Sequence, residues 1–108
     1  MTPPLVTAAS LSYLGNAAFG VAVASGAIDN RRIRWIHHTL YVVTCTLTTA
    51  AIVAGASQRR ASGLALLPAL GPLAALPYAG GGLRRHATVA GAAAPAYAIG
   101  LALILKGR

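Results

Sequence analysis

Acidic side chains are almost missing from this sequence, in which Asp29 is the one aspartate or glutamate among 108 residues. Charged residues of both signs make up 9% of the chain, whereas a soluble domain carries about 25%. So few charged groups cannot cover the surface of a water-soluble globule. The chain also offers no pair of carboxylates for general acid–base catalysis or for a hard metal ion.

Cysteine and nucleotide-binding motifs are equally scarce. The one cysteine, Cys45, excludes an internal disulfide and any cysteine-pair metal site. The glycine-rich stretch AGGGLRR at 79–85 lacks the lysine and the hydroxyl of a phosphate-binding loop. Serines are present, but no acid within an apolar stretch could orient a base beside them. We therefore predict no catalytic residues, no metal site and a protein that is not an enzyme.

Apolar residues, by contrast, make up 56% of the chain, and the mean hydropathy is +0.67. The nine basic residues fall in four short clusters, and the stretches between them approach the roughly 20 residues that a helix needs to cross a bilayer. The pattern predicts an all-α integral membrane protein, with four transmembrane helices in a compact bundle with short loops. We expect one domain over 1–108 and helices at about 4–28, 34–55, 61–78 and 86–105.

The net charge of +8 indicates a lipid partner better than a nucleic acid. The basic residues cap apolar segments instead of lining one exposed face, and such clusters meet anionic phospholipid headgroups. We expect a multi-pass protein of a bacterial plasma membrane that binds no nucleic acid.

Proline and repeat patterns refine the expected bundle. Pro68, Pro72 and Pro77 predict a kinked third helix, since each removes a backbone donor. The stretches NRRIRWIHH and LRRHATV each place an Arg-Arg turn before a helix that opens with histidine. Two parallel helical hairpins would explain this, although short basic turns are common enough to arise without a repeat.

Small residues recur at four-residue spacing on two of the expected helices. Such stripes let helix backbones approach closely, and membrane helices associate largely through that packing. The sequence therefore predicts tight helix contacts, within the chain or with a partner. The stripes consist of Ser12, Asn16 and Gly20 on the first helix, and of Ala87 with Gly91 and Ala94 with Ala98 on the fourth.

The stretch RRIRWIHHTLYV at 31–42 has the composition of a membrane boundary. Arginines reach lipid phosphates while aromatic rings lie at headgroup depth. We interpret this stretch, together with the basic pair before the fourth helix, as an interfacial anchor. The predicted anchors are Arg31, Arg32, Arg34, Trp35, Tyr41, Arg84 and Arg85.

The histidines allow a second interpretation. His37, His38 and His86 lie at similar depth near two helix starts, so His37 or His38 could oppose His86 and bind haem b or a quinone. The eight residues RWIHHTLY resemble helix starts in ferric-reductase-type haem membrane domains. This chain lacks the second histidine deeper in the same helix. The anchor interpretation therefore predicts no cofactor, and haem b stays the alternative.

Polar residues inside the expected spans are few, namely Asn16, Thr44 and Thr48. An asparagine there is usually a hydrogen-bonding link between helices, and threonine hydroxyls usually bond to the preceding turn. The four spans and weak charge bias invite comparison with small multidrug exporters. Proton coupling needs a titratable group in the span, and the first helix of this chain has Asn16 but no glutamate. The sequence therefore disfavours a proton-driven exporter.

These observations favour a non-catalytic accessory or structural subunit, which packs in a larger membrane complex or against copies of itself. The alternatives are a haem-b or quinone-binding electron-transfer protein using His37 or His38 with His86, and a small transporter or channel.

Overall fold

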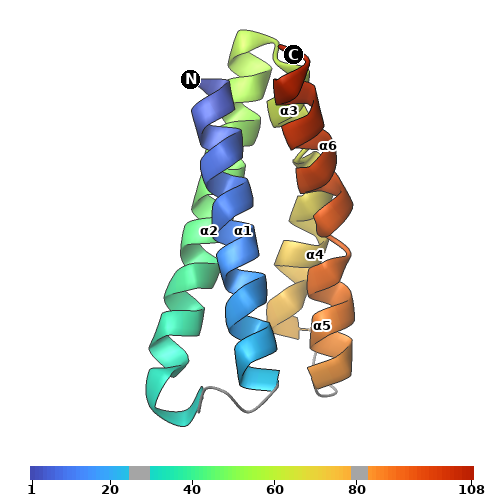
Figure 1. Ribbon diagram of the computed structural model, residues 1–108. Helices are drawn as coiled ribbons and strands as arrows, with labels where there is room; N and C mark the ends of the chain where they lie inside the picture. The colour runs from blue at the N-terminus through green and yellow to red at the C-terminus, as the bar shows by residue number, and fades with distance from the viewer. Residues whose placement is uncertain (25–29, 79–82) are drawn as a thin grey trace.

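The computed structural model describes the fold of residues 1–24, 30–78 and 83–108, and these residues form a bundle of four helices (Figure 1). The first two helices are continuous, and the third and fourth are each built from shorter pieces. In chain order the elements are α1 (Thr2–Ala24), α2 (Asn30–Gln58), α3 (Ala61–Leu64), η1 (Leu67–Ala69), α4 (Leu70–Ala75), η2 (Leu76–Tyr78), α5 (Leu83–Gly91) and α6 (Ala94–Leu105).

The bundle is elongated, with principal extents of 42 × 21 × 19 Å. Both chain termini lie at one end, beside the turn from α2 into α3 (Figure 1). We call this the terminal end. The opposite end, where α1 finishes and α5 begins, carries His37 and His86, and we call it the histidine end.

The four-helix, all-α prediction is confirmed, and within the described residues three helices are long and apolar enough to cross a membrane. These are Thr2–Ala22, Trp35–Gln58 and Arg85–Leu105. The expected second helix at 34–55 runs further in both directions. The expected first helix at 4–28 begins earlier, and its last residues lie outside the described residues.

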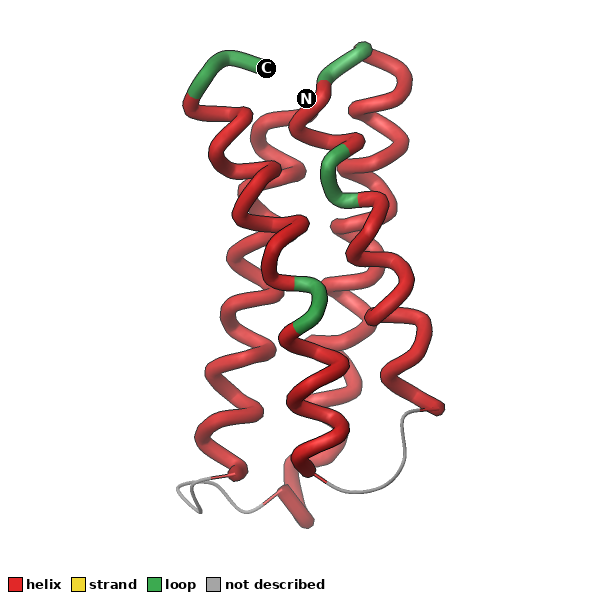
Figure 2. Tube along the Cα trace, turned by 90° about the vertical axis from the view of Figure 1, so that its right-hand side faces the viewer, coloured by secondary structure: helices red, strands yellow, loops and turns green. Residues whose placement is uncertain are grey.

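The third predicted span, 61–78, bends as its prolines require and is more broken than expected. It is divided among α3, η1, α4 and η2, and Figure 2 shows the loop that follows α3. Pro68 lies within η1, Pro72 within α4 and Pro77 within η2. Each proline removes a donor and clashes with the preceding turn, so an uninterrupted α-helix cannot persist through all three. The longest apolar helical stretch here is Ala61–Ala75.

The fourth predicted span, 86–105, is interrupted once. Residues 92 and 93 form a turn between α5 and α6, and Pro95 occupies the first turn of α6. Proline suits that position because the amide it lacks has no partner in a first turn. Figure 2 shows this turn as a loop segment about halfway along the helix that ends at the C-terminus.

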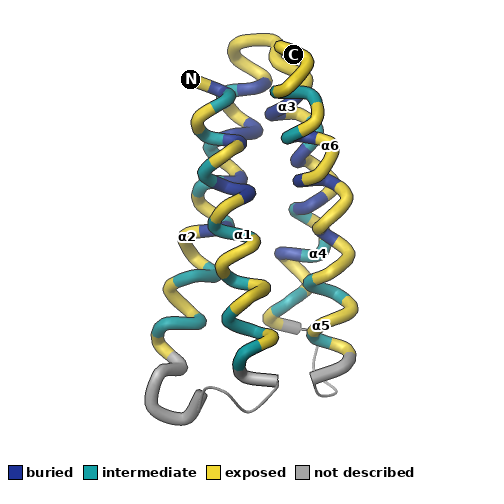
Figure 3. The backbone as a smooth tube through the Cα atoms, viewed as in Figure 1, coloured by how far each residue is buried: buried dark blue, intermediate teal, exposed yellow. Residues whose placement is uncertain are grey.

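Buried residues concentrate in the half of the bundle nearest the termini (Figure 3). Here α1, α2, η1 and α6 share one apolar core, together with turn residues next to η1 and α6. Its larger members are Val6, Ile52, Leu66 and Tyr97. The other members are alanines, whose small size lets the helices approach closely.

Two glycines produce the tightest contact in this core. A methyl group on Gly55 of α2 would lie 2.7 Å from the Cα of Gly63 in α3, and one on Gly63 would collide with the carbonyl oxygen of Ala51. No side chain fits between these backbones. The turn before α3 places Arg59 at φ 55°, with the Arg60 amide bonded to the Gly55 carbonyl at 2.8 Å, which closes the end of α2.

Candidate functional site: a cavity at the histidine end

A cavity of about 250 Å³ lies between the helices of the bundle at the histidine end. Its walls come from α1, α2, α4 with η2, and α5, so segments from all four helices of the bundle contribute. The wall is mainly apolar and includes Val21, Leu73 and Leu76. Its polar side chains are those of Tyr13, Asn16, His37, Tyr41 and His86.

The space exists because the residues facing it are small. Ala17 and Gly20 of α1 and Ala87, Ala90 and Gly91 of α5 all line the cavity. A methyl group built on Gly20 or Gly91 would meet no atom within 4 Å. The two helices therefore stand apart here, unlike the glycine contact at the terminal end.

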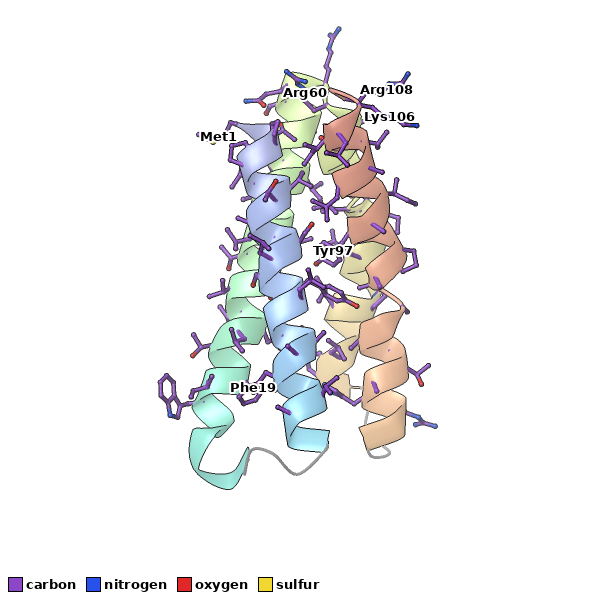
Figure 4. All side chains as sticks on the ribbon, in the orientation of Figure 1. Met1, Phe19, Arg60, Tyr97, Lys106 and Arg108 are labelled. Carbon is purple, nitrogen blue, oxygen red and sulfur yellow. The ribbon has the colours of Figure 1, made fainter. Side chains whose placement is uncertain are left out.

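Two imidazole rings face each other at the cavity. The centroids of His37 and His86 lie 5.8 Å apart, with their planes tilted by 52°. Phe19 stacks on His37, with the ring centroids 5.7 Å apart, and Figure 4 shows Phe19 at the histidine end. Within the described residues neither imidazole takes part in a hydrogen bond. Both rings thus retain donor and acceptor nitrogens.

Two tyrosines tie the helices together around the cavity. The Tyr41 hydroxyl donates to the Leu73 carbonyl, joining α2 to α4. The Tyr13 hydroxyl donates to the Ala90 carbonyl at 2.8 Å, joining α1 to α5. Tyr13 also stacks on Tyr97, with the ring centroids 4.5 Å apart, which connects the cavity to the core. These contacts fix the spacing of the walls.

Tyr13 was not predicted as a site residue, although the sequence carries a signal for it. Tyr13, Asn16 and Gly20 are spaced at i, i+3 and i+7, so they share one helical face, and that face lines the cavity. Tyr13 is a large aromatic residue among small ones on this face. Such a residue indicates that the neighbouring helix packs at a greater distance there than it does against small residues.

The predicted intramembrane polar residues separate into two places. Thr44 is buried, and its hydroxyl lies 2.6 Å from that of Ser12, 3.4 Å from the Asn16 amide nitrogen and 2.8 Å from the Leu40 carbonyl. This group joins α1 to α2 beside the cavity. Thr48 lies one turn further on, and its hydroxyl is 2.8 Å from that of Tyr97.

The structure places some of the predicted anchor and haem residues differently from the sequence prediction. Tyr41 does not anchor the surface: it lies four residues after His37, on the same face of α2, and therefore points into the bundle. The histidine that opposes His86 is His37, whereas His38 is exposed and lies outside the cavity wall.

The remaining anchor predictions concern the surface. Trp35 is 67% exposed, and Arg85 is exposed. The side chains of Arg31, Arg32, Arg34 and Arg84 lie outside the described residues. At the opposite end Figure 4 places Arg60, Lys106 and Arg108 beside the termini.

The cavity has the chemistry of a binding site for a neutral, largely apolar group. Among the residues described, no three histidine, cysteine or acidic side chains gather as a metal site. An iron between two imidazoles requires ring centroids about 6 Å apart, because metal–nitrogen bonds measure about 2 Å. The His37–His86 separation of 5.8 Å meets that condition. However, drug-sized ligands occupy about 300–1,000 Å³, and the 250 Å³ present favour a smaller group than a porphyrin.

Comparison with known proteins adds no relative: a scan against protein-family models and searches of curated proteins and of solved structures found no match.

Proposed function

We propose that this chain is a multi-pass membrane protein that serves as a non-catalytic subunit, packing against the helices of a larger membrane complex or against further copies of itself. One observation carries this proposal. A stripe of exposed small residues runs along α5 and α6, on either side of the turn at residues 92 and 93.

Dimensions and surface chemistry support membrane insertion. The 42 Å length of the bundle matches the roughly 40–45 Å of a bilayer with its headgroup regions. Large apolar side chains point outwards along the long helices, where lipid would solvate them. Examples are Leu11, Leu14, Val42, Val53 and Ile99, which are between 46% and 64% exposed.

The stripe on α5 and α6 differs from those outward faces. Its members are spaced by four, three, four and four residues, so they follow one side of the helix. All are exposed: Ala87, Gly91, Ala94, Ala98 and Ala102. Lipid requires no such run of small residues, whereas a partner helix does, because small side chains allow backbones to approach closely.

The small-transporter alternative has less support. A pathway needs polar groups that face an opening. Asn16 faces the cavity at the histidine end, but Thr44 and Thr48 are buried, and their hydroxyls bond to neighbours inside the bundle.

The experiment replaces Ala98 with leucine, which would hold a partner helix away from the stripe. The control is Ala18→Leu, a matched change at an exposed alanine of α1 outside the stripe. Tagged chains are extracted in mild detergent, and particle mass is measured by light scattering with the detergent subtracted. We expect a particle larger than one 10.9 kDa chain for the parent and for Ala18→Leu, and dissociation for Ala98→Leu. A parent protein that is monomeric in both detergent and lipid nanodiscs contradicts the proposal.

A further inference from the structure

We propose that the cavity at the histidine end binds the ring headgroup of a membrane quinone, with His37 and His86 donating hydrogen bonds to a carbonyl oxygen of the ring. The proposal concerns binding alone. The cavity shares Ala87 and Gly91 of α5 with the packing stripe, but its test uses other residues than the Ala98→Leu test of packing.

Cavity volume restricts the occupant to a single ring with small substituents. A protein cavity of about 150 Å³ is enough to hold benzene. The 250 Å³ enclosed here therefore accept a six-membered ring with additional oxygen, methyl or methoxy groups. A porphyrin exceeds that space.

The wall opens towards the side of the bundle, where lipid would lie. Ala17 and Val21 of α1 and Ala87 and Gly91 of α5 line the cavity and are also exposed. Because these residues border the seam between α1 and α5, a ligand dissolved in the membrane can enter through that seam. A quinone could place its ring inside and leave its isoprenoid tail among the lipids.

Polar groups in the wall match the oxygens of such a ring. A neutral imidazole offers one N–H donor, and an oxygen bonded to it lies about 4 Å from the ring centroid, since N···O distances are near 2.9 Å. Two imidazoles whose centroids are 5.8 Å apart can therefore share one oxygen. The Asn16 amide lies in the wall contributed by α1 and can meet the second oxygen.

Charge and aromatic contacts favour the same class of ligand. No carboxylate lines the described cavity, so an organic cation would find no counter-charge there. Phe19 stacks on the face of His37, which leaves the N–H in the plane of that imidazole free to donate to a quinone oxygen.

The test is a titration of the detergent-purified protein with decylubiquinone, followed through quenching of the fluorescence of Trp35. This is the one tryptophan of the sequence, two residues before His37 on α2. We expect saturable quenching in the parent. Losing one hydrogen bond of about 1.4 kcal/mol should weaken binding about tenfold in His37→Ala and in His86→Ala.

Two further variants make the result specific to the cavity. His38→Ala is the matched control, because His38 adjoins His37 and is exposed, and its titration should equal that of the parent. Gly20→Leu should abolish saturable quenching by filling the space, and its backbone can be expected to tolerate the change, since a methyl group there meets no atom within 4 Å. Circular dichroism confirms that each variant stays helical.

Several outcomes would overturn the proposal. One is linear, non-saturating quenching that is equal in all forms, which reports mere partition into the micelle. Another is an equal loss in His38→Ala and His37→Ala. A Soret band in protein purified from native membranes would identify haem as the occupant and exclude a quinone from the same imidazoles.

Discussion

The two ends of this bundle use the same small residues to opposite effect. At the terminal end Gly55 and Gly63 bring the backbones of α2 and α3 into contact, and a shared apolar core surrounds them. At the histidine end Gly20 and Gly91 face open space and help to form a cavity of about 250 Å³. Glycine therefore permits close backbone contact at one end and leaves space for a cavity at the other.

The two ends differ in the elements that face these glycines. α3 follows α2 after a tight turn and can lie directly on it. At the histidine end the facing elements are tied across by hydrogen bonds from Tyr13 and Tyr41, whose long side chains set a wider spacing. A small residue closes a gap only where the opposite backbone is free to approach.

The largest expected effect comes from breaking the backbone contact at the terminal end. Gly63→Ala places a methyl group against the Ala51 carbonyl oxygen and the Gly55 backbone. Forcing atoms into a well-packed site costs about 1–3 kcal/mol, and we expect about 3 kcal/mol because the neighbours are backbone. Thermal unfolding in detergent, followed by circular dichroism, measures the change.

Gly71→Ala is the matched control for that substitution, because a methyl group on Gly71 meets no atom within 4 Å. It should leave the unfolding temperature unchanged or raise it slightly. Equal destabilisation by both variants would show that the close contact is not what holds the terminal end together.

A smaller effect is expected from the buried hydroxyl pair next to the core. Thr48→Val removes the partner of the Tyr97 hydroxyl, which lies 2.8 Å away, and leaves that hydroxyl buried. Hydrogen bonds between membrane helices average about 0.6 kcal/mol, and an unsatisfied group adds to the loss, so we expect about 1 kcal/mol. Denaturation of the purified protein with increasing sodium dodecyl sulfate measures it.

Ser62→Ala serves as the control, since the Ser62 hydroxyl is buried and has no hydrogen-bond partner in the described part of the chain. Its removal should be neutral or stabilising. If it destabilises as much as Thr48→Val does, the loss reflects packing and not the bond to Tyr97.

The smallest expected effect is at the histidine end. Gly20→Ala adds a methyl group to open space within a long helix. Alanine loses less backbone entropy than glycine on entering a helix, so stability should rise by about 0.5 kcal/mol. The same unfolding assay measures it, and a loss comparable to that of Gly63→Ala would remove the distinction between the two ends.

Much of the fold follows from the sequence. The arginine pairs and uncharged stretches predict four helical segments and the positions of their connections. Pro68, Pro72 and Pro77 predict where the third helix bends. The extent of that break was not predictable, because neighbouring contacts decide whether a proline kinks a helix or divides it.

The candidate site was predicted in part. Histidines from α2 and α5 were expected to oppose each other at one depth, and the structure pairs His37 with His86. The choice between His37 and His38 was open, because adjacent residues point about 100° apart on a helix and the rotation of α2 is set by its packing on α1. Tyr41 was expected at the lipid surface and instead faces inwards for the same reason.

The sequence alone determined the helical class, the approximate ends of the helices and the shortage of charged groups. These properties depend on local composition, which suits the segments to lipid better than to water. Only the tertiary structure decided which glycines touch, which leave a cavity, and which histidine lines it. Those outcomes depend on how far apart and at what rotation the helices pack, and that is fixed by contacts between residues far apart in the chain.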